Sequence, residues 1–135
     1  MSREEIIGII AEYLVRQPFV AAAYLFGSAA RDYMHVYSDV DIAVLFKAGA
    51  GEKPALFDSR LQMEMDLSDL VGRSVQIVDY DMASPYLRHQ IRKYGKVIVD
   101  KEPKLRMTKE VSSLRQYLDM LPVYNYCIDA ALRRL

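Results

Sequence analysis

Apolar residues follow this chain in two kinds of pattern, one typical of helices and the other of strands. Over residues 4–17 they recur every three or four positions, which predicts an amphipathic helix with Ser2 as its N-cap. Two unbroken apolar runs then predict strands over 20–26 and 39–46, and Gly27 ends the first of them. The chain therefore begins with a helix followed by two strands.

The later elements follow from the same patterns and from the Gly and Pro residues between them. In chain order we expect a loop over 47–54, a helix over 57–71, a strand over 74–80, a helix led by Ser84-Pro85, an edge strand over 97–99 and a helix from Lys104. Pro122 is expected to break or kink that helix and leave a separate one at the C-terminus. This order predicts an α/β (α+β) fold with a small mixed sheet flanked by helices. Residues 1–103 would form the domain and 104–135 its helical appendage.

The composition fits one globular domain and argues against a nucleic-acid-binding or membrane protein. Of the 135 residues 52% are hydrophobic, and 18 basic residues balance 18 acidic ones, which argues against a nucleic-acid binder driven by overall basicity. No run approaches the ~18 apolar residues of a membrane span, and the first residues lack the layout of a signal peptide. We therefore expect a cytoplasmic protein without a membrane partner. Cys127, the single cysteine, excludes an intrachain disulfide and is expected to be packed.

Charge is distributed unevenly along the chain. Residues 1–46 hold three Lys or Arg against six Asp or Glu, whereas residues 86–135 hold eleven against five. The acidic part suits a metal site, and the basic part suits either an acidic partner or a solvated helix.

Gly27-Ser28 and the pair Asp39 and Asp41 carry the strongest chemical signal. Strand side chains alternate in direction, so the two aspartates point the same way and repel each other unless a cation lies between them. Gly27 lets backbone approach a bulky anion, and the Ser28 hydroxyl can hold phosphate oxygens. Each pair alone is ordinary turn chemistry. Together, each beside an apolar strand, they predict a site for Mg²⁺ and a nucleotide.

This stretch, "GSAARDYMHVYSDVDIAVL", resembles the G-S-x10-D-x-D signature of minimal nucleotidyltransferases in the DNA polymerase β superfamily. It is most similar to the MntA-family antitoxins of HEPN/MNT toxin–antitoxin pairs. Two later stretches, "SVQIVDYDMASPYLRHQIRKYGKVIVD" and "LRQYLDMLP", extend the resemblance more weakly over most of the chain.

The resemblance implies a polymerase β-like nucleotidyltransferase fold and a defined site. Gly27 and Ser28 would bind the nucleotide, and Asp39 and Asp41 would be the catalytic residues that hold Mg²⁺. The implied reaction moves AMP from ATP to a tyrosine of a HEPN-domain toxin, an RNase, which is thereby neutralised. The expected partners are therefore ATP and a HEPN toxin, with a homo- or hetero-oligomer possible and no direct contact with nucleic acid.

The third strand departs from the family pattern, which reads roughly V-D-L-V-D-L and supplies a third carboxylate from its first Asp. Here residues 75–80 read V-Q-I-V-D-Y, so Gln76 takes that position. A neutral amide coordinates weakly and cannot accept a proton from an incoming hydroxyl. Asp79 matches the second family Asp, but in a regular strand it lies on the face opposite Gln76, and only a bulge would turn it inward.

Other functions remain open beside adenylyl transfer. A catalytically degenerate antitoxin would act by binding alone, because Gln76 replaces the third acid. A small-molecule nucleotidyltransferase, such as an aminoglycoside-modifying enzyme, usually carries an additional substrate domain, for which 135 residues leave little room. A D-x-D glycosyltransferase would need a much longer α/β domain.

Overall fold

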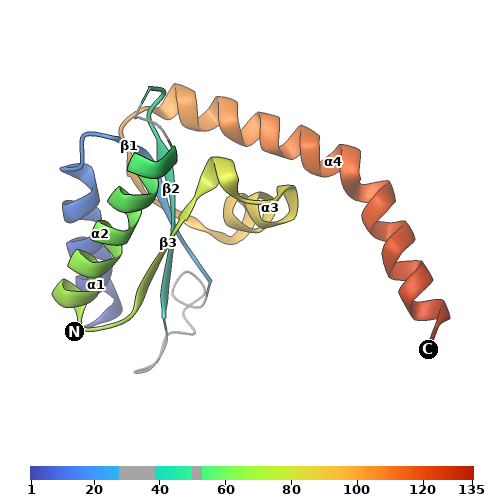
Figure 1. Ribbon diagram of the computed structural model, residues 1–135, viewed down its shortest axis with the longest axis horizontal. Helices are drawn as coiled ribbons and strands as arrows, with labels where there is room; N and C mark the ends of the chain where they lie inside the picture. The colour runs from blue at the N-terminus through green and yellow to red at the C-terminus, as the bar shows by residue number, and fades with distance from the viewer. Residues whose placement is uncertain (28–38, 50–52) are drawn as a thin grey trace.

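A mixed β-sheet forms the centre of the protein in the computed structural model, which describes residues 1–27, 39–49 and 53–135. The strands of the described residues are β1 (Val20–Phe26), β2 (Val40–Phe46), β3 (Val75–Asp79) and β4 (Lys96–Asp100). They lie in the order β3-β2-β1-β4 (Figure 1). Strand β1 pairs antiparallel with β2 and β4, whereas β2 and β3 pair parallel. The predicted mixed sheet, with its brief last strand at an edge, is confirmed.

Helices cover both faces of this sheet (Figure 1). They are α1 (Arg3–Val15), α2 (Lys53–Val71), α3 (Pro85–Tyr94) and α4 (Pro103–Arg133), with a short 3₁₀ helix, η2 (Tyr80–Met82), after β3. The two predicted N-caps are present. The Ser2 hydroxyl accepts from the Glu5 N–H at 3.2 Å, and the Ser84 hydroxyl accepts from the Leu87 N–H at 3.1 Å.

The core has two layers because strand side chains alternate between the faces of the sheet. Val40, Ile42 and Val44 of β2 pack with buried residues of α1 and α2, whereas Ala43 and Leu45 face the opposite layer. That second layer holds the buried side chains of β1, η2 and α3, and the first turn of α4 packs against it. Strand β2 is thus covered on both sides by apolar groups.

Three sequence-based predictions were wrong. Helix α2 already begins at Lys53, so the predicted loop over 47–54 is shorter than expected. The separate C-terminal helix expected after a break at Pro122 is not present, because α4 runs through Pro122 to Arg133. The other expected outcome, a kink, agrees with the bend of this helix (Figure 1). A proline removes one N–H from the ladder, and the other bonds of so long a helix maintain it. Cys127 is exposed rather than packed. In the part of the chain that the structure describes, no helix is long and apolar enough to cross a membrane.

Helix α4 is tied to the sheet by polar contacts near its first turns. The Tyr24 hydroxyl donates to Glu110 at 3.0 Å, and Arg106 donates to both Glu110 and Asp100, each at 3.0 Å. The pair Arg106–Glu110 has side chains that are only 18% and 20% exposed, so these bonds are partly shielded from water. One turn later the buried Tyr80 hydroxyl donates to the Ser113 hydroxyl at 2.7 Å. The start of α4 is therefore fixed to the body of the domain.

The buried Tyr80–Ser113 bond predicts a measurable stability effect. Replacing Ser113 by alanine leaves the Tyr80 hydroxyl buried without its acceptor, so we expect Ser113→Ala to lower the free energy of unfolding by about 1–3 kcal/mol. Urea unfolding followed by circular dichroism measures it. The double variant Tyr80→Phe/Ser113→Ala should recover part of the loss, because neither polar group then remains unpaired.

The neighbouring Ser112→Ala is the matched control, because Ser112 is exposed on the same turn of α4. Equal destabilisation by Ser112→Ala and Ser113→Ala would show that the bond does not anchor α4.

Candidate active site

The last residues of β1 and the first residues of β2 lie at the same end of the sheet, and this brings predicted site residues together. Phe26 is paired with Asp41 across the two strands, so Gly27, the next residue, lies beside Asp41. Asp41 is half-buried, and Asp39 stands exposed just before β2. The structure therefore brings together Gly27, Asp39 and Asp41. Ser28 lies outside the described residues.

Gly27 approaches the Asp41 carboxylate more closely than any other residue type could. Its φ of +72° lies in the left-handed region, and a Cβ at this position would stand 2.7 Å from Asp41 Oδ2. Such a distance is shorter than carbon and oxygen atoms tolerate, so glycine meets two constraints here at once. Its missing side chain leaves the Asp41 oxygen open on the side of the preceding strand.

The surroundings of Asp41 disfavour the ionised form of its carboxyl group. Burial raises the pKa of the Asp41 carboxyl above its usual value of 3.8, and the nearby charge of Asp39 raises this pKa further. Two adjacent carboxylates, one partly desolvated, cost stability when both are ionised. A cation between them relieves that cost.

Gln76 lies directly beside Asp41 in the sheet. The parallel register of β2 and β3 pairs Asp41 with Gln76, so both side chains lie on the face that α3 and α4 cover. Gln76 is exposed. The position at which the sequence analysis expected a third acid thus lies beside Asp41, and it carries a neutral amide.

Two side chains of α2 hold β3 in this register along its outer edge. Glu64 accepts from the Ile77 N–H at 2.8 Å, and the Ser68 hydroxyl accepts from the Val75 N–H at 3.0 Å. Within the described residues no strand lies beyond these N–H groups, so the helix satisfies donors that an edge strand would otherwise expose. The sequence pattern did not single out either residue. Only a weak sequence pattern marks them, because they are two polar residues one helical turn apart, each directly after a buried residue of α2.

Asp79 does not lie on the face of the sheet that Asp41 and Gln76 share. Its register partner is Val44, and the pairing of residues 40–44 with 75–79 runs without a shift, so no bulge turns Asp79 toward Asp41. Its carboxylate instead accepts from the Asp81 N–H at 3.0 Å and caps η2, and burial raises its pKa. The prediction that Asp79 lies on the opposite face is confirmed.

The donor set fits a hard divalent cation. Asp39 and Asp41 offer carboxylate oxygens, which are the ligands that Mg²⁺ prefers when substrate phosphates complete its coordination. Among the residues that the structure describes, no group of three His, Cys, Asp or Glu side chains could hold a metal. Within the described residues the chain thus offers two carboxylates at this point, and a bound phosphate compound would complete the coordination of a metal.

Comparison with known proteins places this geometry in a family. Residues 9–104 match the family model described as polymerase beta, nucleotidyltransferase. A protein of Methanocaldococcus jannaschii named "Putative protein adenylyltransferase" is 30% identical over 89 residues, which are 66% of this chain and 85% of that protein.

Solved structures share the fold over nearly the whole chain. A toxin–antitoxin crystallised with AMP-PNP is 26% identical, with a TM-score of 0.74, and the match covers 96% of this chain and 98% of that one. The MNT antitoxin in complex with the tri-AMPylated HEPN toxin of Shewanella oneidensis has the same fold, with a TM-score of 0.74 over 97% and 99% of the two chains at 24% identity. The predicted nucleotidyltransferase fold is therefore confirmed.

The crowding at Gly27 predicts a specific loss of stability. Gly49 also has a positive φ, +76°, but a Cβ there would meet open space. We expect Gly49→Ala to cost about 1–2 kcal/mol from backbone strain alone and Gly27→Ala to cost somewhat more, because its methyl group would also displace the half-buried Asp41 carboxylate. Thermal unfolding of both variants compares the two costs. In the Asp41→Ala background the difference should shrink, and a difference that stays unchanged would contradict the close approach.

The raised pKa of Asp41 predicts how stability depends on pH. The folded state holds the proton more tightly than the unfolded state, so the ionised carboxylate destabilises the fold at neutral pH, and this cost fades as pH falls through the raised pKa. In EDTA, Asp41→Asn should therefore raise Tm at pH 7 and lose this advantage toward pH 3.8. Asp69→Asn, which removes an exposed carboxylate of α2, is the control and should change little. A lower Tm for Asp41→Asn at pH 7 would show that the carboxylate is structural.

Proposed function

The chain belongs to the polymerase beta nucleotidyltransferase family, and from that membership we propose that it is an antitoxin that transfers AMP from Mg-ATP to a tyrosine of a HEPN RNase toxin. The observation that carries the proposal is the junction of β1 and β2, where Gly27 exposes one oxygen of a partly buried Asp41 beside Asp39. This arrangement disfavours two bare carboxylates and favours their occupation by a metal-bound phosphate compound.

The residues of the site take distinct roles in this proposal. Asp39 and Asp41 hold the metal, which when bound supplies positive charge to the phosphates. The backbone at Gly27, with Ser28 after it, binds the triphosphate. Because Asp41 is partly desolvated, its interaction with a cationic metal is stronger than that of a solvated carboxylate. The two aspartates thus fix the nucleotide at the end of the sheet.

Known relatives support the choice of nucleotide and partner. The M. jannaschii relative is named for protein adenylyl transfer, and a toxin–antitoxin that resembles this chain over nearly its whole length was crystallised with the ATP analogue AMP-PNP.

Gln76 determines how the proposed transfer proceeds. The tyrosine oxygen forms a bond to the α-phosphorus as the bond to pyrophosphate breaks, and the tyrosine proton must leave. Gln76, the neighbour of Asp41, cannot accept that proton, so it passes to water. Such transfer depends mainly on positioning and charge neutralisation, with general-base catalysis adding about 10²–10⁴ in rate. We therefore expect a slow but real transferase.

A second candidate, an antitoxin that neutralises its toxin by binding alone, is favoured by the same observation. Asp79 faces the other side of β3, so within the described residues the neighbouring strand offers no replacement carboxylate at this site. The two candidates share the partner and differ in whether AMP reaches it.

The product of the neighbouring gene, expressed without this chain, tests the proposal. After purification the partner is incubated with the chain, ATP and Mg²⁺, and its mass is followed over time. The parent should add AMP, the double variant Asp39→Asn/Asp41→Asn should add none, and Gln76→Asp should be faster by up to about 10²–10⁴ because it restores a proton acceptor.

Two controls separate the possible outcomes. Asp79→Asn keeps an acceptor for the η2 cap and should leave the rate unchanged. Calorimetry with ATP should show binding in Mg²⁺ and none in EDTA. If the partner binds but gains no mass with either the parent or Gln76→Asp, the binding-only antitoxin replaces the transferase. If ATP binds equally well in EDTA, the two-aspartate site is wrong.

A further inference from the structure

The neighbours of Asp41 across the sheet carry no negative charge. Its register partner on β1 is Phe26, and its register partner on β3 is Gln76. Side chains of paired residues lie on the same face of a sheet, so a phenyl ring and a neutral amide flank the Asp41 carboxylate. In this row across β1, β2 and β3, Asp41 is the one carboxylate.

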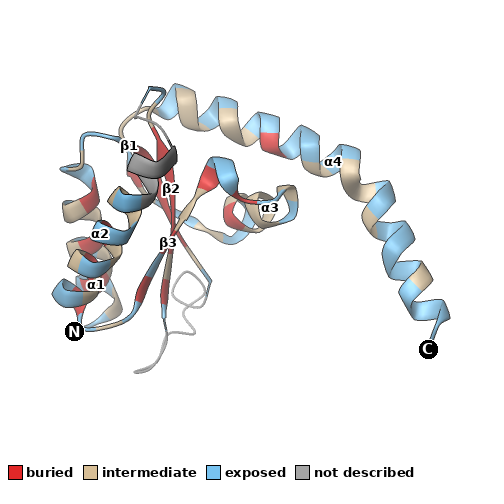
Figure 2. Ribbon diagram, viewed as in Figure 1, coloured by how far each residue is buried: buried red, intermediate tan, exposed pale blue. Residues whose placement is uncertain are grey.

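The packing of the two central strands holds Asp41 in this row. Strands β1 and β2 are buried along most of their length (Figure 2). Gly27 lies so close to Asp41 that a Cβ on this glycine would stand 2.7 Å from Asp41 Oδ2. Asp39, the other described carboxylate of the site, is exposed and directly precedes β2. Both carboxylates of the described site therefore come from β2 and the residue before it, and the paired residues Phe26 and Gln76 add none.

The charge of this pair of carboxylates matches one divalent cation. Burial raises the pKa of the Asp41 carboxyl, and the charge of Asp39 raises it further, so the two ionised groups destabilise each other while no cation is present. One divalent cation balances their two negative charges and removes the repulsion. Once it is bound, the pair has no net charge left with which to attract a second cation.

A second divalent cation needs ligands that the paired strands do not offer. Two such ions in one site lie about 3.5–4 Å apart and repel each other, so anionic oxygens must lie between and around them. Mg²⁺ also requires nearly ideal octahedral coordination by oxygen atoms. The Gln76 amide has one neutral oxygen, and its NH₂ group only donates. It therefore neither screens the repulsion between two cations nor replaces a carboxylate ligand.

Position 76 sets the charge beside Asp41 without setting the fold. Gln76 adjoins Asp41 on the parallel neighbour of β2, and paired strands lie about 4.8 Å apart. The side chain of Gln76 is exposed. Strand β3 is held by other groups, because Glu64 accepts from the Ile77 N–H at 2.8 Å and Ser68 accepts from the Val75 N–H at 3.0 Å. A carboxylate can therefore take the place of the amide while β3 keeps its register.

We propose that Gln76 restricts the site to one divalent cation, which Asp39 and Asp41 bind together with the nucleotide, and that a carboxylate at position 76 would admit a second. This inference rests on the proposed function, because it concerns the same nucleotide site. In a two-metal site the ions stabilise both the attacking and the leaving oxygen. With one cation on the nucleotide, the acceptor hydroxyl has no metal ligand of its own. Gln76 thus affects metal binding as well as proton transfer.

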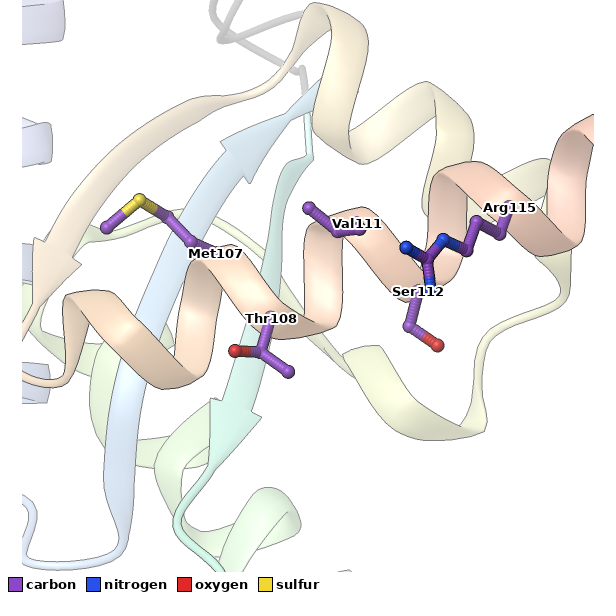
Figure 3. A pocket seen from close by; sticks show the side chains of 5 residues that line it. All are labelled: Met107, Thr108, Val111, Ser112 and Arg115. Atoms are coloured by element: carbon purple, nitrogen blue, oxygen red, sulfur yellow. The ribbon is translucent and has the colours of Figure 1, made fainter.

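Other described surfaces do not compete for a hard cation. In the part of the chain that the structure describes, no group of three His, Cys, Asp or Glu side chains could hold a metal. A shallow hollow of about 360 Å³ on α4 is lined by Met107, Thr108, Val111, Ser112 and Arg115 (Figure 3). The one charged side chain among these five is a cation. The number of divalent cations that the chain retains with a nucleotide therefore reports on the site at Asp41.

Manganese binding with an uncleavable nucleotide tests the proposal. The probe is Mn²⁺ together with an ATP analogue that has a methylene group between its α- and β-phosphorus atoms. Electron paramagnetic resonance measures how many Mn²⁺ ions each chain retains and whether two bound ions are spin-coupled. The parent should retain one uncoupled ion per nucleotide. Gln76→Asp should retain two coupled ions, because the added carboxylate provides the anionic ligand that a second ion needs.

Two matched controls separate the charge at position 76 from other effects. Gln76→Asn has the length of the aspartate variant without its charge, and it should retain one ion. Gln116→Glu adds a carboxylate on α4, outside the site, and it should also retain one ion. Circular dichroism of all three variants should match that of the parent, because the side chains of Gln76 and Gln116 are exposed.

The outcomes distinguish this inference from the proposed function. Two coupled ions in the parent overturn the inference and leave the proposed transferase intact. One ion in Gln76→Asp also overturns it, because position 76 then does not set the number of ions, and so do two ions in Gln76→Asn. If the parent binds the analogue equally well in EDTA, the two-aspartate site itself is wrong, and the proposed function fails together with the inference.

Discussion

Strand β2 is paired on both edges and covered on both faces, and this confinement sets the geometry of the site. Of its seven residues only Asp41 is not fully buried. A shift of β2 by one residue would turn Asp41 into the layer formed by α1 and α2 and expose half of the core. The apolar residues that follow Asp41 therefore hold its carboxylate at the end of the sheet. Gly27 and Gln76 reach it because their strands pair with β2.

The same fixed register explains why Asp79 does not lie on the face of the sheet that carries Asp41. Asp79 is close to Gln76 in sequence, yet β3 presents it to the opposite face, where it caps the next turn. The bonds from Glu64 and Ser68 to the outer edge of β3 make a change of register costly, because each would leave a backbone donor unpaired. A further carboxylate can be placed beside Asp41 through a substitution at position 76, whereas sliding the strand would break the hydrogen bonds along its edge.

Much of this architecture is local and could be predicted from the sequence. Alternation and run length predicted β1 with its observed bounds, and Ser2 and Ser84 marked their helices through hydrogen bonds within one turn. The motif around Asp39 and Asp41 pointed to the site. The close approach of Gly27 to Asp41 could not be predicted, because it depends on how two strands pair across a long connection. Whether α4 continues through Pro122 could not be predicted either, since helix propensity describes single residues and packing at both Tyr117 and Tyr124 holds the helix across the proline.

The apolar layer on the face of the sheet that carries Asp41 also fixes the start of helix α4. Its buried residues come from β1, β2, η2 and α3, and Leu105 of α4 packs against it. On the same side the hydroxyls of Tyr24 and Tyr80 donate to Glu110 and Ser113 of α4. Ala43 and Leu45, which follow Asp41 on its face of β2, belong to this layer. The position of Asp41 and the direction in which α4 leaves the sheet therefore depend on the same packing.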